Sequence, residues 1–290
     1  MIFAIIGPTA SNKSFLVDEF ASYLNNDVLV INFDAYQIYK QMNIGTAKPR
    51  KEFLKLHKNY LMYDFVDVNQ KFDVCSYQKI VRKIIDDNIN KDIILVGGTG
   101  FYLKSLLYDY KYIEEPPMSE DYLRDLTNEE LYNKLFLVDP IDANKITMHN
   151  RKRLLRALYV YDVHKKSKTE LNNNGKNKLL YPDVVFIGIS PNRDSLYENI
   201  NNRVDKMIKE GLVNEVSLLK KEYPFKNQAL EAIGYKEFFY GLSLNDTIEL
   251  IKKNTRHYAK RQLTYFKHQF ENVLWFEDAE SALKFLKQKY

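Results

Sequence analysis

The amino-terminal stretch Ile2-Phe3-Ala4-Ile5-Ile6-Gly7-Pro8-Thr9-Ala10-Ser11-Asn12-Lys13-Ser14 joins a short apolar run to the start of a predicted helix. A run of five apolar residues that ends at a glycine is typical of a buried parallel strand. From Lys13 to Leu24, apolar residues recur at helical spacing, which predicts an amphipathic helix. A loop between such a strand and such a helix is where phosphate-binding loops occur.

The chemistry of this loop favours an anion. Backbone N–H groups of the loop and of the helix start converge on one point, and the helix dipole adds attraction. The loop Gly7–Ser14 differs from the usual pattern because Asn12 stands where a second glycine is expected, although asparagine tolerates left-handed backbone geometry. The alternative is an ordinary helix start capped by Thr9 or Ser11. The residues predicted to bind a diphosphate or a nucleotide are Gly7, Pro8, Thr9, Ala10, Ser11, Asn12, Lys13 and Ser14, with the Ser14 hydroxyl as a possible Mg²⁺ ligand.

Strand and helix patterns alternate through the first hundred residues. Val28–Phe33 and Ile93–Val96 read as strands, and Tyr77–Ile89 reads as a helix. This alternation predicts an α/β fold with a P-loop-type parallel sheet flanked by helices. Because the carboxyl ends of parallel strands meet at one edge, Gly7–Ser14, Asp34 and Gly97–Gly100 are expected to line one crevice.

The middle of the chain has a different pattern. Residues 112–180 contain helical segments without strands, and Val184–Ile189 then reads as a returning core strand. Helices follow near Asp194–Glu210, Leu212–Lys221 and Thr247–Phe270, before a last strand at Val273–Phe276. We therefore predict a discontinuous catalytic core at 1–111 and 181–290, with a helical insertion domain at 112–180.

Composition limits the classes of protein to consider. The 290 residues are 45% hydrophobic, which is enough for a packed core. A single cysteine, Cys75, excludes an intrachain disulfide and a cysteine-rich zinc site. The amino terminus lacks a basic signal-peptide region, and no apolar stretch approaches the length of a membrane span. The expectation is a cytoplasmic protein, monomeric and not membrane-bound, whose net charge of +5 weakly favours anionic partners.

The usual accessories of nucleotide hydrolases are absent from the sequence. There is no Asn-Lys-x-Asp guanine-binding motif, and the third strand runs into Gly97-Gly98-Thr99 instead of a metal-binding aspartate. Asp34 is the one carboxylate at the end of a core strand in the first hundred residues. Its residue type and position allow a metal ligand, a general base or a helix N-cap.

Six blocks of sequence resemble the tRNA dimethylallyltransferase (isopentenyltransferase) family, in the family's order and over nearly the whole chain. Outside the first loop, the most specific blocks run from Asp34 through Gln37 and Gly45 to Pro49, and from Ala259 to Thr264. The others are Val96-Gly97-Gly98-Thr99-Gly100-x-Tyr102, Arg153-x-x-Arg156-Ala157-Leu158, and Ala232-Ile233-Gly234-Tyr235-Lys236-Glu237. The departures are Asn12 for glycine, Tyr159 for glutamate and Tyr265 for tryptophan.

The resemblance implies an activity and a set of site residues. The family transfers a dimethylallyl group from dimethylallyl diphosphate to N6 of the adenosine just 3′ of the anticodon, with Mg²⁺ as cofactor. The resemblance implies that Asp34 is the general base and that Thr99 aligns N6. It also implies that Arg203 helps to bind the diphosphate, with Arg193 as a nearby competitor for that match. The implied catalytic residues are Lys13, Asp34, Thr99 and Arg203.

Two basic, acid-free stretches agree with a tRNA partner. Lys145–Arg156 lies in the predicted insertion domain, and Lys252–Phe270 carries six Lys or Arg residues with interleaved aromatics. Solvated helix surface is the alternative for both stretches, and core packing is the alternative for the aromatics. The resemblance and these stretches imply contacts with the tRNA anticodon stem-loop at Asp34, Ala35, Tyr36, Gln37, Lys152, Arg153, Arg156, Gly234, Tyr235, Lys236, Arg256, Lys260, Arg261, Gln262, Thr264 and Lys267.

Three other functions stay open on the sequence. The first is a prenyltransferase acting on free adenylate, which needs no surface for an anticodon loop. The second is a P-loop small-molecule kinase, which leaves the block from Asp34 to Pro49 without a role. The third is an RNA-binding protein whose loop is inactive because of Asn12.

Overall fold

The computed structural model describes the whole chain except residues 26–27, 113–114, 173–177 and 224–226. The described residues form two compact units. One unit comprises Met1–Tyr108 and Leu180–Tyr290, and the other comprises Asp109–Leu179.

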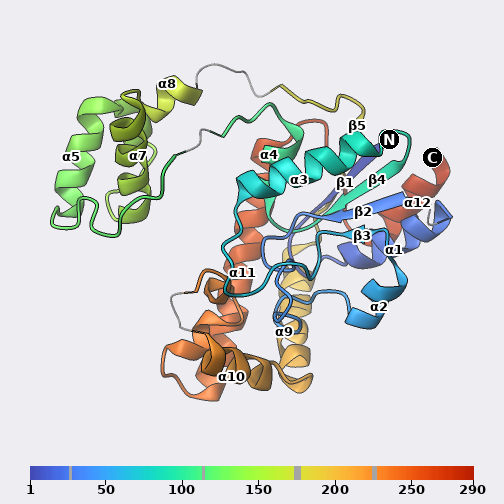
Figure 1. Cartoon of the computed structure of the whole chain (residues 1–290). Helices are drawn as coiled ribbons and strands as arrows, with labels where there is room; N and C mark the ends of the chain where they lie inside the picture. Colours follow the sequence, from blue (N-terminus) through green and yellow to red (C-terminus); the bar gives the residue numbers. More distant parts are fainter. Residues whose placement is uncertain (26–27, 113–114, 173–177, 224–226) are drawn as a thin grey trace. The chain divides into compact units, whose positions relative to one another are not determined.

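A parallel sheet forms the centre of the larger unit (Figure 1). Its strand order is β3-β2-β4-β1-β5-β6, and every pair of neighbours is parallel. Ile5 of the central strand lies between Val96 and Ile187, so the carboxyl ends of β1, β4 and β5 are level. The strands are β1 (Ile2–Ile6), β2 (Val28–Asn32), β3 (Tyr60–Leu61), β4 (Asp92–Val96), β5 (Val184–Ile189) and β6 (Leu274–Phe276).

Helices cover both faces of this sheet. Alternate strand residues such as Phe3 and Ile5 pack with Leu16 and Phe20 of α1 (Lys13–Tyr23) and with Ala282 of α12 (Ala279–Lys289). Figure 1 shows α3 (Val74–Asp87) and α4 (Gly100–Leu107) on the other face. The strands are apolar on both sides because both sides are covered, as expected for a parallel sheet.

Beyond the carboxyl edge of the sheet lies a layer of helices that supplies further site residues. The long α11 packs against α9 and α4, and its Ala259 is buried against Leu196 and Ile200 of α9. A small side chain at position 259 lets the two helices approach closely. The elements are α9 (Arg193–Lys209), α10 (Leu212–Glu222), η1 (Ala229–Glu231), η2 (Lys236–Phe239) and α11 (Leu244–Gln269).

The fold class is confirmed, and the structure adds elements that the sequence analysis did not predict. These are β3, α2 (Lys51–Leu56), η1, η2 and α12. β3 has two residues, too few for an alternation pattern to be visible. The stripe of Ala279, Ala282 and Leu286 on α12 is a helical signal that the analysis overlooked.

The smaller unit contains helices and no strand among its described residues. Its elements are α5 (Asn128–Val138), α6 (Pro140–Ala143), α7 (Arg151–His164) and α8 (Lys168–Asn172). Leu131 and Leu135 of α5 pack against Leu154 and Leu158 of α7. In the described part of the whole chain, no helix is both long enough and apolar enough to cross a bilayer.

Candidate active site

The loop between β1 and α1 is shaped by close packing at its first residue. Gly7 has φ +150°, and a Cβ on it would lie 2.7 Å from the carbonyl oxygen of Ile189. Only glycine can leave the strand at this point without moving β5. The Ser11 hydroxyl donates to the carbonyl of Pro8 at 2.8 Å, which closes the loop.

Asn12 occupies the left-handed backbone region, with φ 62° and ψ 25°. It is also the N-cap residue of α1, but its side chain accepts no capping hydrogen bond. The alternative of an ordinary helix start capped by Thr9 or Ser11 is therefore wrong. Residue 12 adopts the left-handed conformation, which asparagine tolerates in place of glycine.

Lys13 curls back over the loop. Its Nζ donates to the Pro8 carbonyl at 2.6 Å and lies 3.5 Å from the Ser11 hydroxyl oxygen. Burial, with a further contribution from the Arg203 guanidinium, lowers the pKa of Lys13 to about 7. Arg203 is therefore near enough to Lys13 to destabilise its charged form. Two cations so close together favour an anion between them.

Asp34 lies just beyond β2, beside these cations. Its Oδ1 accepts from the backbone N–H of Tyr36 at 2.9 Å, and the Asn32 side chain accepts from the N–H of Asp34 at 2.9 Å. Burial raises the pKa of Asp34, and the N–H groups of Tyr36 and Gln37 oppose that rise. No helix begins here, so the helix N-cap interpretation is wrong, although the carboxylate does cap a turn.

Hydrogen bonds between distant segments bind the loops at the sheet edge to one another. The side chain of Gln262 accepts from the N–H of Thr9 at 2.8 Å and donates to the carbonyl of Gly98 at 2.8 Å. The Thr99 hydroxyl accepts from the N–H of Ala35 at 3.0 Å, which places it next to Asp34 in the chain fold. These hydrogen bonds therefore fix the positions of the three loops that follow β1, β2 and β4 relative to one another.

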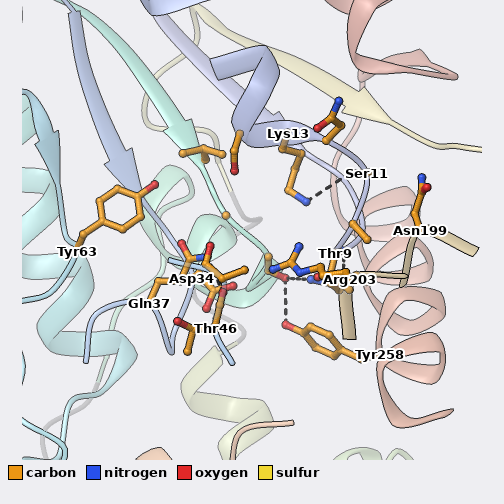
Figure 2. Close-up of a pocket in the computed structure, with 18 residues that line it drawn as sticks. Thr9, Ser11, Lys13, Asp34, Gln37, Thr46, Tyr63, Asn199, Arg203 and Tyr258 are labelled. Atoms are coloured by element: carbon orange, nitrogen blue, oxygen red, sulfur yellow. Dashed lines mark hydrogen bonds between the residues drawn. The ribbon is translucent and has the colours of Figure 1, made fainter. Parts of the chain in front are cut away.

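The loops enclose a cavity of 460 Å³. Figure 2 shows Lys13, Asp34 and Arg203 together in it, with Tyr258 entering from α11. Lys13 comes from α1, Asp34 follows β2, and Arg203 comes from α9. The three charged side chains of this cavity therefore come from three separate segments of the chain. Thr99 is not among the lining residues. A second cavity of 270 Å³ shares Asp34, Arg203 and Tyr258 with the first.

The structure brings residues to the site that the sequence analysis did not name. Glu215 of α10 accepts from the backbone N–H groups of Asn43, Ile44 and Gly45, at 3.0 to 3.3 Å, and from the hydroxyl of Tyr235 at 2.6 Å. It therefore holds the loop whose Thr46 and Ala47 line the first cavity. Tyr63 and Asn199 also line that cavity. No local pattern marks these residues, although Asn199 lies one helical turn before Arg203.

The predicted RNA-contacting residues differ in exposure. Those exposed are Lys152, Arg153, Arg156, Lys260, Arg261, Thr264 and Lys267. Those half-buried around the cavities or on α11 are Asp34, Ala35, Tyr36, Gln37, Lys236 and Arg256. Gly234, Tyr235 and Gln262 are buried. The side chains of Tyr235 and Gln262 form hydrogen bonds within the protein, so in this structure both support the site.

Two predicted RNA-binding arginines have partners in the protein. Arg256 donates to the Asn201 side chain at 2.7 Å, and Arg156 forms an ion pair with Glu115. Lys152 and Arg153 lie on the same helix as Arg156, and both side chains are exposed to solvent. In this unit they are the cations more available to a phosphate.

A magnesium ion fits this site as a companion of a bound diphosphate. No group of three or more His, Cys, Asp or Glu residues among the described positions could hold a metal alone. Mg²⁺, however, usually keeps several waters and is held by few protein ligands together with substrate phosphates. The exposed Ser14 hydroxyl in the wall of the cavity suits that mode of binding.

Fold and cavity together define an α/β protein with a cavity that contains Lys13 and Arg203 at the carboxyl edge of a parallel sheet. A family model described as IPP transferase matches residues 37–269. A tRNA dimethylallyltransferase of Anoxybacillus flavithermus is 38% identical over 290 residues, covering 97% of this chain and 92% of the relative. Its counterpart from Bacillus subtilis is 37% identical over 297 residues, covering 98% and 93%. The chain belongs to the IPP transferase family and is a transferase.

Solved structures agree with this assignment. The tRNA Δ(2)-isopentenylpyrophosphate transferase of Staphylococcus epidermidis is 35% identical, with a TM-score of 0.69 over 99% of this chain and 96% of that one. A eukaryotic dimethylallyltransferase described as acting on tRNA is 27% identical, with a TM-score of 0.80 over 97% of this chain and 74% of that one.

Replacing Asn12 tests the left-handed loop position. We expect Asn12→Gly to keep or slightly improve stability and affinity for the prenyl donor, because glycine adopts φ 62° without strain. Asn12→Ala should lose about 1 kcal/mol of unfolding free energy, because its Cβ disfavours this conformation. Urea denaturation of the three proteins measures the difference. Equal stability of the glycine and alanine variants would contradict the assigned backbone conformation.

The lowered pKa of Lys13 predicts proton uptake on binding. With a pKa of about 7 in the free protein, Lys13 is largely neutral at pH 8, and a bound anion raises its pKa again. Dimethylallyl diphosphate should therefore bind with uptake of a proton at pH 8 and with less uptake at pH 6. Calorimetry in buffers of different ionisation enthalpy measures this uptake. It should vanish in Lys13→Met, and uptake that persists there would assign the proton to another group.

Proposed function

We propose that this protein transfers a dimethylallyl group from dimethylallyl diphosphate to N6 of the adenosine 3′ to the anticodon, at position 37 of tRNA. The names of the relatives support the reaction. The observation that carries the proposal is the single cavity in which two cations, Lys13 and Arg203, face one carboxylate, Asp34. A leaving diphosphate needs the two cations, and an attacking amine needs the carboxylate.

The cationic end of the cavity suits the leaving group. When the allylic C–O bond breaks, its electron pair goes to the diphosphate, whose negative charge increases. Donors already oriented toward that charge stabilise the transition state, typically by about 10²–10³ in rate for each donor. Loop N–H groups, Lys13 and Arg203 are the donors of this chain. Magnesium held by Ser14 and the diphosphate would add positive charge at the same place.

The carboxylate end of the cavity suits the nucleophile. The lone pair of N6 forms the new N–C bond, and the amine must then lose a proton. Asp34 accepts that proton, and because its burial raises its pKa, it is a stronger base than an ordinary aspartate. The resemblance to the family adds a role for the Thr99 hydroxyl in orienting N6, next to Asp34 through its bond to Ala35.

The second cavity gives the adenine a place. It is lined by Tyr36, Lys236 and Arg261 as well as by Asp34, the carboxylate that also lines the first cavity. Enzymes that modify a base extrude it from the stacked loop at a cost of a few kcal/mol. Aromatic and guanidinium planes such as those of Tyr36 and Arg261 suit a splayed base.

We also propose an RNA-binding role for each unit. On α11, the exposed cations Lys260, Arg261 and Lys267 would hold backbone phosphates of the anticodon loop. In the insertion domain predicted at 112–180, Lys152 and Arg153 would contact the stem-loop. A free adenylate would need neither set, which makes RNA the better acceptor.

One assay separates this function from its alternatives. The protein is incubated with dimethylallyl diphosphate, Mg²⁺ and unmodified tRNA, and in parallel with AMP or ATP. Prenylated tRNA supports the proposal. Prenylated AMP, phosphoryl transfer from ATP, or tRNA binding without a product supports the free-adenylate prenyltransferase, the kinase and the inactive RNA-binding protein, respectively.

Asp34→Ala should abolish transfer while tRNA affinity stays close to that of the wild type. Loss of the general base lowers the rate by about 10²–10⁴, whereas the exposed phosphate contacts remain. Single-turnover transfer and filter binding measure the two effects separately. Near-normal turnover of the variant would show that another group removes the N6 proton.

Replacing Lys260 and Lys267 together by alanine should weaken tRNA binding. The dependence of log K on log salt should also become flatter by about one unit for each lost phosphate contact. The matched control is Lys83→Ala with Lys284→Ala, two exposed lysines on α3 and α12 that line none of the described cavities. A slope that is equal in the two double variants would remove Lys260 and Lys267 from the interface.

A further inference from the structure

The side chain of Tyr63 lies in the wall of the diphosphate cavity. Tyr63 follows the short strand β3, two residues after Leu61, and lines the same cavity as Lys13, Ser14 and Arg203. Figure 2 shows its ring on the side of the cavity away from Asn199, with the hydroxyl directed inward. The residue therefore approaches the cavity from a segment that supplies none of the cations.

The hydroxyl of Tyr63 is available to a ligand. Within the part of the chain that the structure describes, it makes no hydrogen bond, whereas the neighbouring Tyr60 hydroxyl donates to Asp18 at 2.6 Å. The ring packs against the core cluster that contains Tyr60, and the centroids of the two rings are 6.4 Å apart. A half-buried hydroxyl without a protein partner is costly unless water or a ligand satisfies it.

The surroundings of Tyr63 keep its proton in place. Burial raises the pKa of Tyr63, and the carboxylates of Asp18 and Asp34 add to that rise. The group therefore acts as a hydrogen-bond donor at neutral pH and does not compete with Asp34 as a base. A diphosphate between Lys13 and Arg203 would carry the greatest density of acceptor oxygens in this cavity.

We propose that the Tyr63 hydroxyl donates a hydrogen bond to a diphosphate oxygen of the prenyl donor, as the third side of a clamp whose other sides are Lys13 and Arg203. This inference rests on the proposed function, because it takes the diphosphate as the occupant of the cavity. The bond strengthens as the C–O bond breaks and charge moves to the diphosphate. Tyr63 thus contributes to donor binding and also to the rate of transfer.

The variant Tyr63→Phe removes the hydroxyl and keeps the ring. We expect it to bind magnesium pyrophosphate about tenfold more weakly than the wild type, the usual size for one hydrogen bond to a charged acceptor. It should also lower kcat for transfer to tRNA. The matched control is Tyr77→Phe, because the Tyr77 hydroxyl is buried on α3, has no hydrogen-bond partner among the described residues, and lies outside the cavity lining. Calorimetry measures binding, and urea denaturation shows that both variants fold.

The outcomes separate this inference from the proposed function. If the wild type binds pyrophosphate and Tyr63→Phe binds it equally well with equal kcat, the Tyr63 hydroxyl has no role and the proposed reaction stands. Equal losses in Tyr63→Phe and Tyr77→Phe would also overturn the inference, since they would reflect general loosening of the fold. If the wild type binds no pyrophosphate, the proposed function and this inference both fail.

Discussion

The site depends on an excess of positive charge in its cavity, where two cations face one carboxylate. Lys13 and Arg203 lie in one cavity, and the guanidinium adds to the effect of burial in lowering the pKa of the lysine. Asp34 is the carboxylate beside them, and burial destabilises its charged form. The surrounding fold holds these charges close together. A bound polyanion would reduce the repulsion between the two cations. In the proposed function, the cations would bind the departing diphosphate and the carboxylate would serve the attacking amine.

The framework is a set of connections between segments far apart in the chain. Gln262 bridges the loops after β1 and β4, and Thr99 anchors the segment after Asp34. Glu215 holds the loop at 43–45 through three backbone N–H groups. None of these side chains needs to touch a substrate to matter. They hold in place the loops that carry the cavity residues, as is typical of preorganised sites.

The local elements of the fold were largely predictable. The strands β1, β2, β4 and β5 and the helix α11 follow patterns of period two or 3.6, or buried apolar runs, and those patterns arise from short-range geometry. The left-handed position of Asn12 was also foreseeable, because few residue types tolerate it. The two-residue β3 was not, because a strand of that length exists only through its pairing with β2. The burial of Tyr235 and Gln262 could not be predicted either, because the same polar groups can bind RNA or form hydrogen bonds within the protein.

Residue types and spacings alone predicted the parallel α/β class, a phosphate-binding loop, the carboxylate at a strand end and the family, and of these the fold class and the family are confirmed. Each of these is expressed within about twenty consecutive residues or within motifs that keep their order. The folded chain decided which side chains share a cavity, that Arg203 faces Lys13, and that Tyr63 reaches the same place from β3. The reason is physical: such meetings depend on the packing of α9 on α11 and of β3 at the sheet edge. Those contacts join residues such as Val30 and Tyr60, 30 positions apart, and Asn201 and Arg256, 55 positions apart, and no local pattern encodes them.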